Sequence, residues 1–430
     1  MDLCCCSLSS FVFSLLICAS TPLLLILFLT SVCLTFLSSP STQVRSAPPY
    51  ARFAGFDLKD AFQQLGNHPS QRRLFCMEIL GQIYFWLVGI FGLVAICGLF
   101  GACCDVTCDF IERTFPSLLI RHYVDDFLVV DLAPPDSPHH DRPLSLILAA
   151  VQRFGWELHP DKWFNWTRTF TYLGIDWGVD RKTAALTTSK QRKFALKLRR
   201  FLNAPDFCEA DIASVIGSCQ HACTVTAHRR SKLNGLYRLR SSFKRGSAYA
   251  RKHLDAAAKA EVKDWLRFFE AGPVSCQLDV GGGVFAASIY SDASEHALAV
   301  VVDDKAICVP LPVGYTTLPH INIGVAEAWA FELGVRAAVA LGARDCVLFV
   351  HVDNQGVVFS ARRGRSRNPH LNDAIDRAAD FALSHSLELS VRYVRSADNR
   401  ADAPSRLDCS GFSPLVFDFP RPWDSVLGPS

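Results

Sequence analysis

The sequence predicts a mixed α/β protein that contains an α+β domain, a basic helical region and an α/β domain, in that order. From Ala51 to Thr188, short apolar runs typical of strands alternate with helical stretches. From Ser189 to His253, 15 Lys and Arg stand against three acidic residues, a local excess of +12 in a chain whose formal net charge is +3. From Val284 onward, acids recur at the ends of strand-like runs. A chain of 430 residues can hold two or three such domains.

The first 45 residues, 1–45, form an apolar segment with two open interpretations. No charged residue lies between Asp2 and Arg45, and the run from Phe11 to Leu37 is long enough to span a bilayer. The segment lacks the basic start of a signal peptide. We favour translated non-coding sequence or a gene-model error over a membrane anchor. Residues 39–50, rich in Ser and Pro, form a linker.

Residues 46–188 contain an acidic hairpin tip. The tetrapeptide Tyr123-Val124-Asp125-Asp126 lies between two apolar runs, which predicts a hairpin with adjacent carboxylates at its turn. Asp57, in a second strand-like segment, offers a third carboxylate. Adjacent acids repel each other, and bound Mg²⁺ would remove that cost and support phosphoryl transfer. A plain Asp-Asp turn without a metal is the alternative.

The basic region, residues 189–279, is predicted to be helical and to bind a phosphate backbone. Phe194, Leu198, Phe201 and Leu202 fall on one helix face, whereas basic residues fall on another. Because clustered Lys and Arg displace counterions from a nucleic acid, such a surface favours nucleic-acid binding.

The 17 cysteines indicate neither a disulfide framework nor a zinc ribbon, so reduced thiols in an intracellular protein are expected. One cluster leaves two interpretations open. It either binds zinc or, because two of its cysteines have helical i, i+4 spacing in an apolar stretch, packs in a core. Its members are Cys219, His221, Cys223 and His228.

Residues 280–407 begin with a glycine-rich joint and place acids at four structural positions. One acid ends the strand-like run 287–292, one lies in the first turn of an Ala-rich helix, one follows the apolar run 346–351, and one lies in a terminal helix. These acids are Asp292, Glu327, Asp353 and Asp402. Acids that converge in this way can bind two Mg²⁺ about 4 Å apart and hydrolyse a phosphodiester. A solvated turn or helix start is the alternative for each one alone.

Motif by motif, residues 52–188 resemble the palm of reverse transcriptases. The resemblance implies that Asp57, Asp125 and Asp126 are catalytic and bind the metals. It also implies that six further residues bind the substrate, by lining the nucleotide pocket, by excluding a ribose 2′-hydroxyl as a steric gate, or by contacting the template or the pyrophosphate. These residues are Asp60, Ala61, Phe62, Phe91, Gly92 and Lys162. The chain departs from the family at Ile90, where proline is usual, and in the apolar segment that replaces basic fingers strands. We therefore expect truncated fingers.

The second acidic set resembles the Asp-Glu-Asp-Asp set of ribonuclease H (RNase H). The ending Asn399-Arg400-Ala401-Asp402-Ala403-Pro404-Ser405-Arg406 is similar to the close of retrotransposon RNases H. The resemblance implies that Asp292, Glu327, Asp353 and Asp402 are all catalytic and metal-binding. The histidine that many relatives carry before the last aspartate is not evident. Four arginines either grip a hybrid backbone or form a solvated loop: Arg362, Arg363, Arg365 and Arg367.

Together the resemblances imply an α+β polymerase palm, a helical thumb or connection, an α/β RNase H-like domain and a tail, residues 408–430. They are typical of DIRS-like and LTR-type retrotransposons. The implied function is RNA-directed DNA synthesis with RNase H activity, with Mg²⁺ or Mn²⁺ as cofactor, in the cytoplasm or nucleus. The implied partners are an RNA template, a DNA primer, an RNA–DNA hybrid and deoxynucleoside triphosphates, with a membrane only if residues 1–45 are a true span. The alternatives are a degenerate copy that keeps only RNase H activity and a silent nucleic-acid-binding protein.

Overall fold

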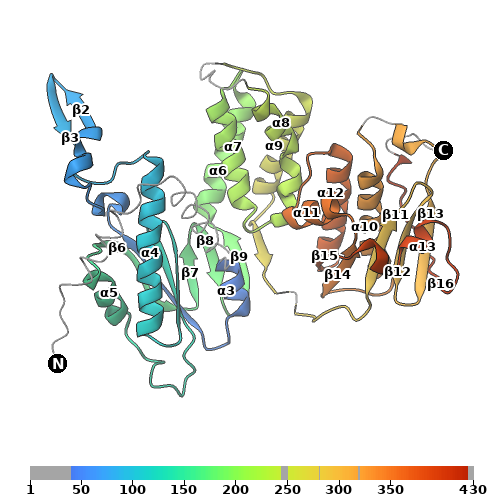
Figure 1. Cartoon of the computed structure of the whole chain (residues 1–430), viewed down its shortest axis with the longest axis horizontal. Helices are drawn as coiled ribbons and strands as arrows, with labels where there is room; N and C mark the ends of the chain where they lie inside the picture. Colours follow the sequence, from blue (N-terminus) through green and yellow to red (C-terminus); the bar gives the residue numbers. More distant parts are fainter. Residues whose placement is uncertain (1–39, 244–249, 280, 318–319, 425–430) are drawn as a thin grey trace. The chain divides into compact units, whose positions relative to one another are not determined.

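The structure, a computed structural model, describes residues 40–243, 250–279, 281–317 and 320–424 and has two compact units, residues 1–184 and 185–430 (Figure 1). The run from Phe11 to Leu37, for which a membrane anchor was one interpretation, lies outside the described residues. Within those described ranges, no helix is both long enough and apolar enough to cross a membrane.

An antiparallel sheet of four strands, in the order β4-β5-β1-β6, forms the centre of the first unit. Its strands are β1 (Arg52–Leu58), β4 (Leu118–Tyr123), β5 (Asp126–Asp131) and β6 (Leu158–Thr167). Both edges of β1 are paired, which buries six of its seven residues. The register places Asp57 directly opposite Asp126. The end of β1 therefore meets the turn between β4 and β5.

Two helices, α4 (Val94–Thr114) and α5 (Leu144–Arg153), cover one face of this sheet. Phe100 of α4 and Ile147 of α5 share a core with Phe56 and Phe127 of the strands. The rings of Phe56 and Phe127 stack with their centroids 4.8 Å apart. Leu58 of β1 and Val129 of β5 belong to the same core. Each lies two residues after the phenylalanine of its strand, so alternate positions of each strand face the helices.

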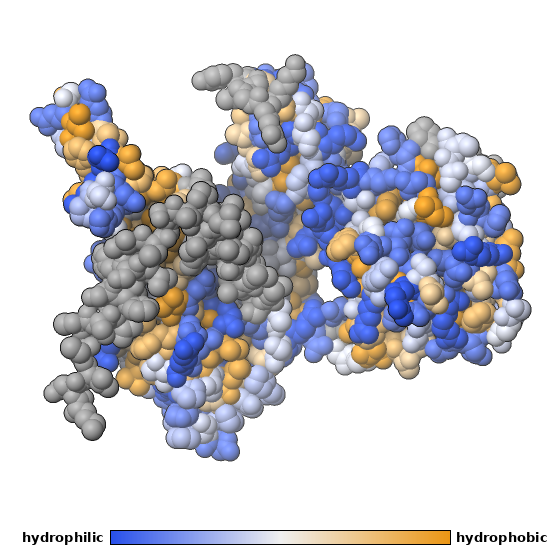
Figure 2. Space-filling view, in the orientation of Figure 1, coloured by the Kyte–Doolittle hydropathy of each residue, from blue (hydrophilic) through white to orange (hydrophobic). Residues whose placement is uncertain are grey.

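The remaining elements of the first unit are short. The hairpin of β2 and β3 carries large exposed apolar side chains, visible as orange atoms in Figure 2. Leu80 and Ile83 are among them. A small sheet contains three strands from this part of the chain in the order β9-β8-β7. The bounds are α3 (Pro40–Ser46), η2 (Ala61–Gln64), η3 (Pro69–Leu74), β2 (Cys76–Ile79), β3 (Gln82–Phe85), β7 (Thr169–Tyr172), β8 (Ile175–Gly178) and β9 (Thr183–Leu186).

The second unit begins with a helical bundle whose first helix agrees with the predicted face. Phe194, Leu198 and Phe201 are buried in the bundle core and Leu202 packs against it. Thr187 caps this helix by accepting a hydrogen bond from the Lys190 backbone N–H at 3.4 Å. The bounds are α6 (Thr188–Asn203), α7 (Glu209–Ala222), η4 (Ala227–Leu233), α8 (Asn234–Ser241), α9 (Ala256–Glu270) and β10 (Ser275–Gln277).

A six-stranded sheet in the order β15-β14-β11-β12-β13-β16 completes the second unit. Strands β11 to β13 are antiparallel, whereas β14 runs parallel to β11 and β15 runs parallel to β14. The bounds are β11 (Ile289–Ala293), β12 (Ala297–Val302), β13 (Lys305–Pro310), β14 (Val347–Val352), β15 (Glu388–Tyr393) and β16 (Ser413–Pro414). Three antiparallel strands followed by a buried parallel strand agree with the sequence pattern.

Helices cover both faces of this sheet. On one face, α10 contributes Trp329 and Leu333 to a core shared with Val300 and Val350. On the other face, Ala401, next to α13, packs against Val301 and its alternate neighbours. The central strand β12 is consequently buried along its whole length. The bounds are η5 (Tyr315–Thr317), α10 (Ile323–Ala340), α11 (Gln355–Arg363), α12 (Pro369–Ser384), η6 (Ser396–Asp398) and α13 (Asp402–Ser405).

One helix begins earlier than the sequence predicted, which corrects the expected place of Glu327. Asn322 caps α10 by accepting a hydrogen bond from the Val325 backbone N–H at 3.3 Å. The helix therefore starts at Ile323, and Glu327 lies in its second turn rather than its first. The prediction overlooked this asparagine, which is a favoured helix cap.

Candidate active sites

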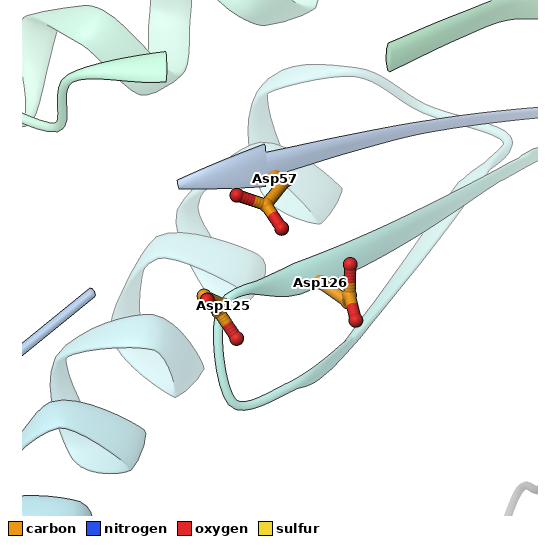
Figure 3. A group of neighbouring side chains, drawn as sticks. All are labelled: Asp57, Asp125 and Asp126. Carbon is orange, nitrogen blue, oxygen red and sulfur yellow. The ribbon is translucent and has the colours of Figure 1, made fainter. Parts of the chain in front are cut away.

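Three carboxylates converge where β1 ends beside the β4–β5 turn. Oxygens of Asp57, Asp125 and Asp126 lie within 4.8 Å of one another (Figure 3). Asp57 is buried, and its Oδ2 accepts a hydrogen bond from Lys162 Nζ at 3.3 Å. The Tyr172 hydroxyl donates to the Asp126 backbone carbonyl at 3.0 Å. The structure thus brings together the three acids of the first predicted site.

The acids of this first cluster favour a bound cation electrostatically. Burial, followed by the charges of Asp57 and Asp125, raises the pKa of Asp126 to about 6. Burial also raises the pKa of Asp125. Partly buried carboxylates held this close are costly when all are ionised, and a divalent cation removes that cost. The donor set, carboxylate oxygens alone, suits Mg²⁺ or Mn²⁺.

A cavity of about 340 Å³ lies against the first cluster. Its walls include Asp57 and Asp125, together with most of the residues predicted to bind substrate: Asp60, Ala61, Phe62, Phe91 and Lys162. Gly92 does not line it. The sequence prediction missed Leu58, Val124 and His159, which complete the wall. Val124 lies in the predicted hairpin turn, whereas the positions of Leu58 and His159 follow from the register of β1 and β6, which no local sequence signal specifies.

The predicted steric gate, Phe62, is held by aromatic neighbours. It is 8% exposed, and its ring centroid lies 5.2 Å from those of both Phe91 and Phe100. The preceding Asp60 and Ala61 have positive φ angles of 58° and 38°, which non-glycine residues rarely adopt. Such backbone strain is typical of binding sites, where the surrounding structure maintains it.

A second acidic cluster lies on the six-stranded sheet. Oxygens of Asp292 on β11, Glu327 on α10 and Asp353 after β14 lie within 4.8 Å of one another. The fourth predicted acid, Asp402, is not in this group. Its Oδ1 instead accepts a hydrogen bond from Arg406 at 3.0 Å, one turn further along. The structure therefore brings together three of the four acids predicted for this site.

Asn399 is part of this second site, although the sequence analysis assigned it no role. Its side chain is buried and donates to the Ser291 carbonyl at 3.1 Å and to Asp292 Oδ1 at 3.4 Å. Its own Oδ1 accepts from the Ala401 backbone N–H at 3.2 Å. Asn399 thus ties the segment that carries Asp402 to β11. Its place in the ending motif was the available signal.

The second cluster also fits a divalent cation. Burial raises the pKa of Glu327 to about 9, and the nearby charges of Asp292 and Asp353 add to this rise. Burial likewise raises the pKa of Asp292 to about 6. One carboxylate oxygen of Glu327, Oε2, is buried and has no hydrogen-bond partner among the residues that the structure describes. A buried carboxylate oxygen that lacks a donor and lies beside two other acids can be satisfied by binding a cation.

We expect metal-free protein to lose stability as pH rises, and Glu327→Gln to reduce that loss. The folded state holds on Glu327 a proton that the unfolded chain releases, so stability falls between about pH 4.5 and pH 9. The variant should be more stable than wild type by roughly 2 kcal/mol at pH 8 in EDTA, after discounting for solvent relaxation. Thermal unfolding at pH 5 and pH 8 tests this.

Glu295→Gln is the matched control, because Glu295 is exposed and near the same site. Equal stability of wild type and Glu327→Gln at pH 8 without metal would contradict the expectation.

The zinc interpretation of the cysteine cluster is not supported. Within the described ranges, the groups of His, Cys, Asp or Glu close enough to share a metal ion are the two acidic clusters. Cys219 and Cys223 are instead buried in the core of the helical bundle. Burial raises the pKa of both thiols, that of Cys223 to about 12, so they are protonated. Core packing accounts for them.

The basic region forms a concave surface. A cavity of about 710 Å³ between α6 and α7 is lined by Arg192, Lys193, Lys197, Arg200 and Arg251. Asp206 and Asp211 line it too, and Asp206 pairs with Arg251 at 2.5 Å. Two of the four arginines predicted as a hybrid grip have structural partners. Arg362 donates to the Val391 carbonyl at 3.0 Å, and Arg365 lies 3.9 Å from the Tyr237 ring centroid.

Comparison with solved structures finds similarity to foamy viral proteins. A foamy viral protease-reverse transcriptase in complex with RNA/DNA hybrid matches with a TM-score of 0.42 and 14% identity, over 80% of this chain and 44% of that one. The complex with dsDNA matches with a TM-score of 0.40 and 13% identity, over 80% of this chain and 68% of that one. A dRH form of the protein in complex with ds DNA matches with a TM-score of 0.39 and 13% identity, over 81% of this chain and 58% of that one. The chain spans less than half the first protein's length. No protein-family profile and no curated protein matches this sequence.

Proposed function

We propose that this chain is a retroelement reverse transcriptase joined to an RNase H, with two separate sites for two-metal phosphoryl transfer. The observation that carries the proposal is the pair of acidic clusters, each of which brings together within 4.8 Å acids from separate segments of the chain. Their order along the chain is the one that the resemblance implies. The basic cavity between α6 and α7 offers a surface for the nucleic-acid backbone.

In the first site, Asp57, Asp125 and Asp126 would hold two Mg²⁺. When bound, the ions supply activation of the primer 3′-hydroxyl and charge neutralisation of the leaving pyrophosphate. Lys162, beside Asp57 on the cavity wall, adds a positive charge where a triphosphate would lie. Phe62 closes the same wall with an apolar surface against the sugar.

In the second site, Asp292, Glu327 and Asp353 would hold the metals that hydrolyse the RNA strand of a hybrid. The supplied chemistry is an activated water and a stabilised leaving oxygen. Asp402 would join this site once its bond to Arg406 is exchanged, and Asn399 holds its segment against Asp292.

Two assays on the purified chain test the proposal. One supplies a primed RNA template, deoxynucleotides and Mg²⁺, and the other a hybrid with labelled RNA. Primer extension together with RNA cleavage, both lost in EDTA, is the expected result. Cleavage without extension favours a degenerate copy that keeps only RNase H activity. Binding without either activity favours the silent binding protein.

Phe62→Val should weaken discrimination against ribonucleotides, because a smaller side chain leaves room for the 2′-hydroxyl. We expect the ratio of ribonucleotide to deoxynucleotide incorporation to rise on the order of tenfold or more, as for other steric selections in a pocket. Steady-state incorporation of a single nucleotide measures it. Phe100→Leu is the control, because Phe100 packs edge-on against Phe62 but does not line the cavity. An unchanged ratio in active Phe62→Val protein would show that the gate assignment is wrong.

A further inference from the structure

The turn that carries the acids of the first site has an unfavourable backbone. Tyr123 pairs with Asp126, so Val124 and Asp125 form a two-residue hairpin loop. Of these two, only Val124 has a positive φ, 58°. Hairpin turns with a positive φ at this position usually have glycine there, and a β-branched residue is strained in it. Contacts elsewhere must therefore hold the turn.

His122 provides such a contact. Its Nδ1 lies 3.1 Å from the Val124 carbonyl oxygen, and its Nε2 lies 3.1 Å from Asp105 Oδ1 on α4. The ring is also nearly parallel to that of Phe127, at an interplanar angle of 26° and 5.4 Å between centroids. The His122 side chain is only 12% exposed. It is thus fixed on three sides, by α4, by β5 and by the turn itself.

The two polar partners of His122 both accept hydrogen bonds. A carbonyl and a carboxylate oxygen are both hydrogen-bond acceptors, so a ring nitrogen that bonds to either one donates its N–H. Asp105 on α4 orients the ring from one edge, and the Nδ1 edge faces the Val124 carbonyl. Two residues further along, the Asp126 carbonyl accepts a hydrogen bond from the Tyr172 hydroxyl at 3.0 Å. The two hydrogen bonds flank Asp125.

We propose that His122 is a positioning residue of the first site, acting through the Val124 carbonyl to hold Asp125 and Asp126 where they bind the metals. The inference rests on the proposed polymerase function for its kinetic consequence. Its structural consequence, a correctly arranged carboxylate cluster, does not require that function. The polar contacts of the His122 ring are with the Val124 carbonyl and Asp105, so its substitution should change the geometry of the site and leave the three acids in place.

The test compares variants of the full chain. His122→Phe keeps an aromatic ring beside Phe127 and removes both hydrogen bonds, whereas His122→Asn keeps an amide at the position of Nδ1 that can donate to the Val124 carbonyl. Asp105→Asn keeps an acceptor for Nε2. The matched control is His140→Phe, because His140 also contacts a backbone carbonyl, that of Ala133, at 2.9 Å but lies away from the acids.

Two readouts separate positioning from general stability. In single-nucleotide addition, His122→Phe should lower kcat on the order of 10- to 100-fold with little change in primer–template affinity, as expected for small misplacement of catalytic groups. Mn²⁺ titration in an Asp292→Asn, Asp353→Asn background, which disables the second cluster, should show weaker binding by about fivefold or more. His122→Asn and Asp105→Asn should retain most of the wild-type kcat and Mn²⁺ affinity, and His140→Phe should retain all of both.

The outcomes distinguish this inference from the proposed function. If wild type never extends a primer, the proposed function fails, and Mn²⁺ affinity alone decides the role of His122. Wild-type Mn²⁺ affinity and kcat in folded His122→Phe would overturn the inference while leaving the proposed function intact. If His122→Phe does not fold, His122→Leu, which also removes both hydrogen bonds, decides: losses of kcat and Mn²⁺ affinity no larger than those of a core variant of equal unfolding temperature, such as Ile147→Ala in α5, would also overturn it.

Discussion

Asp125→Asn and Asp126→Asn should each lower primer extension by about 10³-fold or more and leave hybrid cleavage near the wild-type rate. Both acids belong to the first cluster, so either change removes a metal ligand charge from a site that depends on it. The second cluster lies in the other compact unit and keeps its own three acids. Parallel assays of extension and of labelled-RNA cleavage on the same preparations measure the two effects.

Asp109→Asn is the control for these substitutions. Asp109 lies on α4 in the same unit and forms an exposed ion pair with Arg113 at 2.8 Å. Its loss should change neither activity, because surface pairs of this kind contribute little to stability. Loss of both activities from Asp125→Asn or Asp126→Asn would contradict the model of two independent sites.

The first cluster was predictable because its signal is local. Asp125 and Asp126 lie between two apolar runs, which alone specify a hairpin and its tip. Asp57 was predicted as a third carboxylate of this site, but its place opposite Asp126 was not predicted, since strand order in a sheet is not written in any one segment. The contact between His122 and Asp105 was not predictable, because it depends on how α4 lies against β4.

The second cluster was predictable in outline only. Three of its acids are at strand ends or on the central helix, positions that hydrophobic patterning reveals. The direction of the Asp402 side chain depends on a choice of rotamer, because its carboxylate accepts a hydrogen bond from Arg406 four residues later. Patterning carries no information about such a choice. Likewise, Asn399 resembles a loop asparagine until the structure shows its side chain buried against β11.

Asp353→Asn should lower the rate of RNA cleavage by about 10³-fold or more, while primer extension continues. Asp353 follows β14, and its carboxylate completes a cluster whose other members are Asp292 and the buried Glu327. Removing one charge disturbs the binding of both ions of a two-metal site. Folding should survive, because the charge of Asp353 is one of those that raise the pKa of Glu327 and of Asp292. The metal-free variant should therefore unfold at a higher temperature than metal-free wild type at pH 8.

Binding should outlast catalysis in this variant. The basic cavity between α6 and α7 is untouched by the change, so hybrid affinity and its steep dependence on salt should stay close to wild type. Asp398→Asn is the control, since Asp398 is an exposed partner of Arg395 at 2.7 Å near the same site. Gel-based cleavage, hybrid binding at several salt concentrations and thermal unfolding give the three readouts. Cleavage that persists in EDTA, or that folded Asp353→Asn protein retains, would refute the metal-dependent assignment of the second cluster.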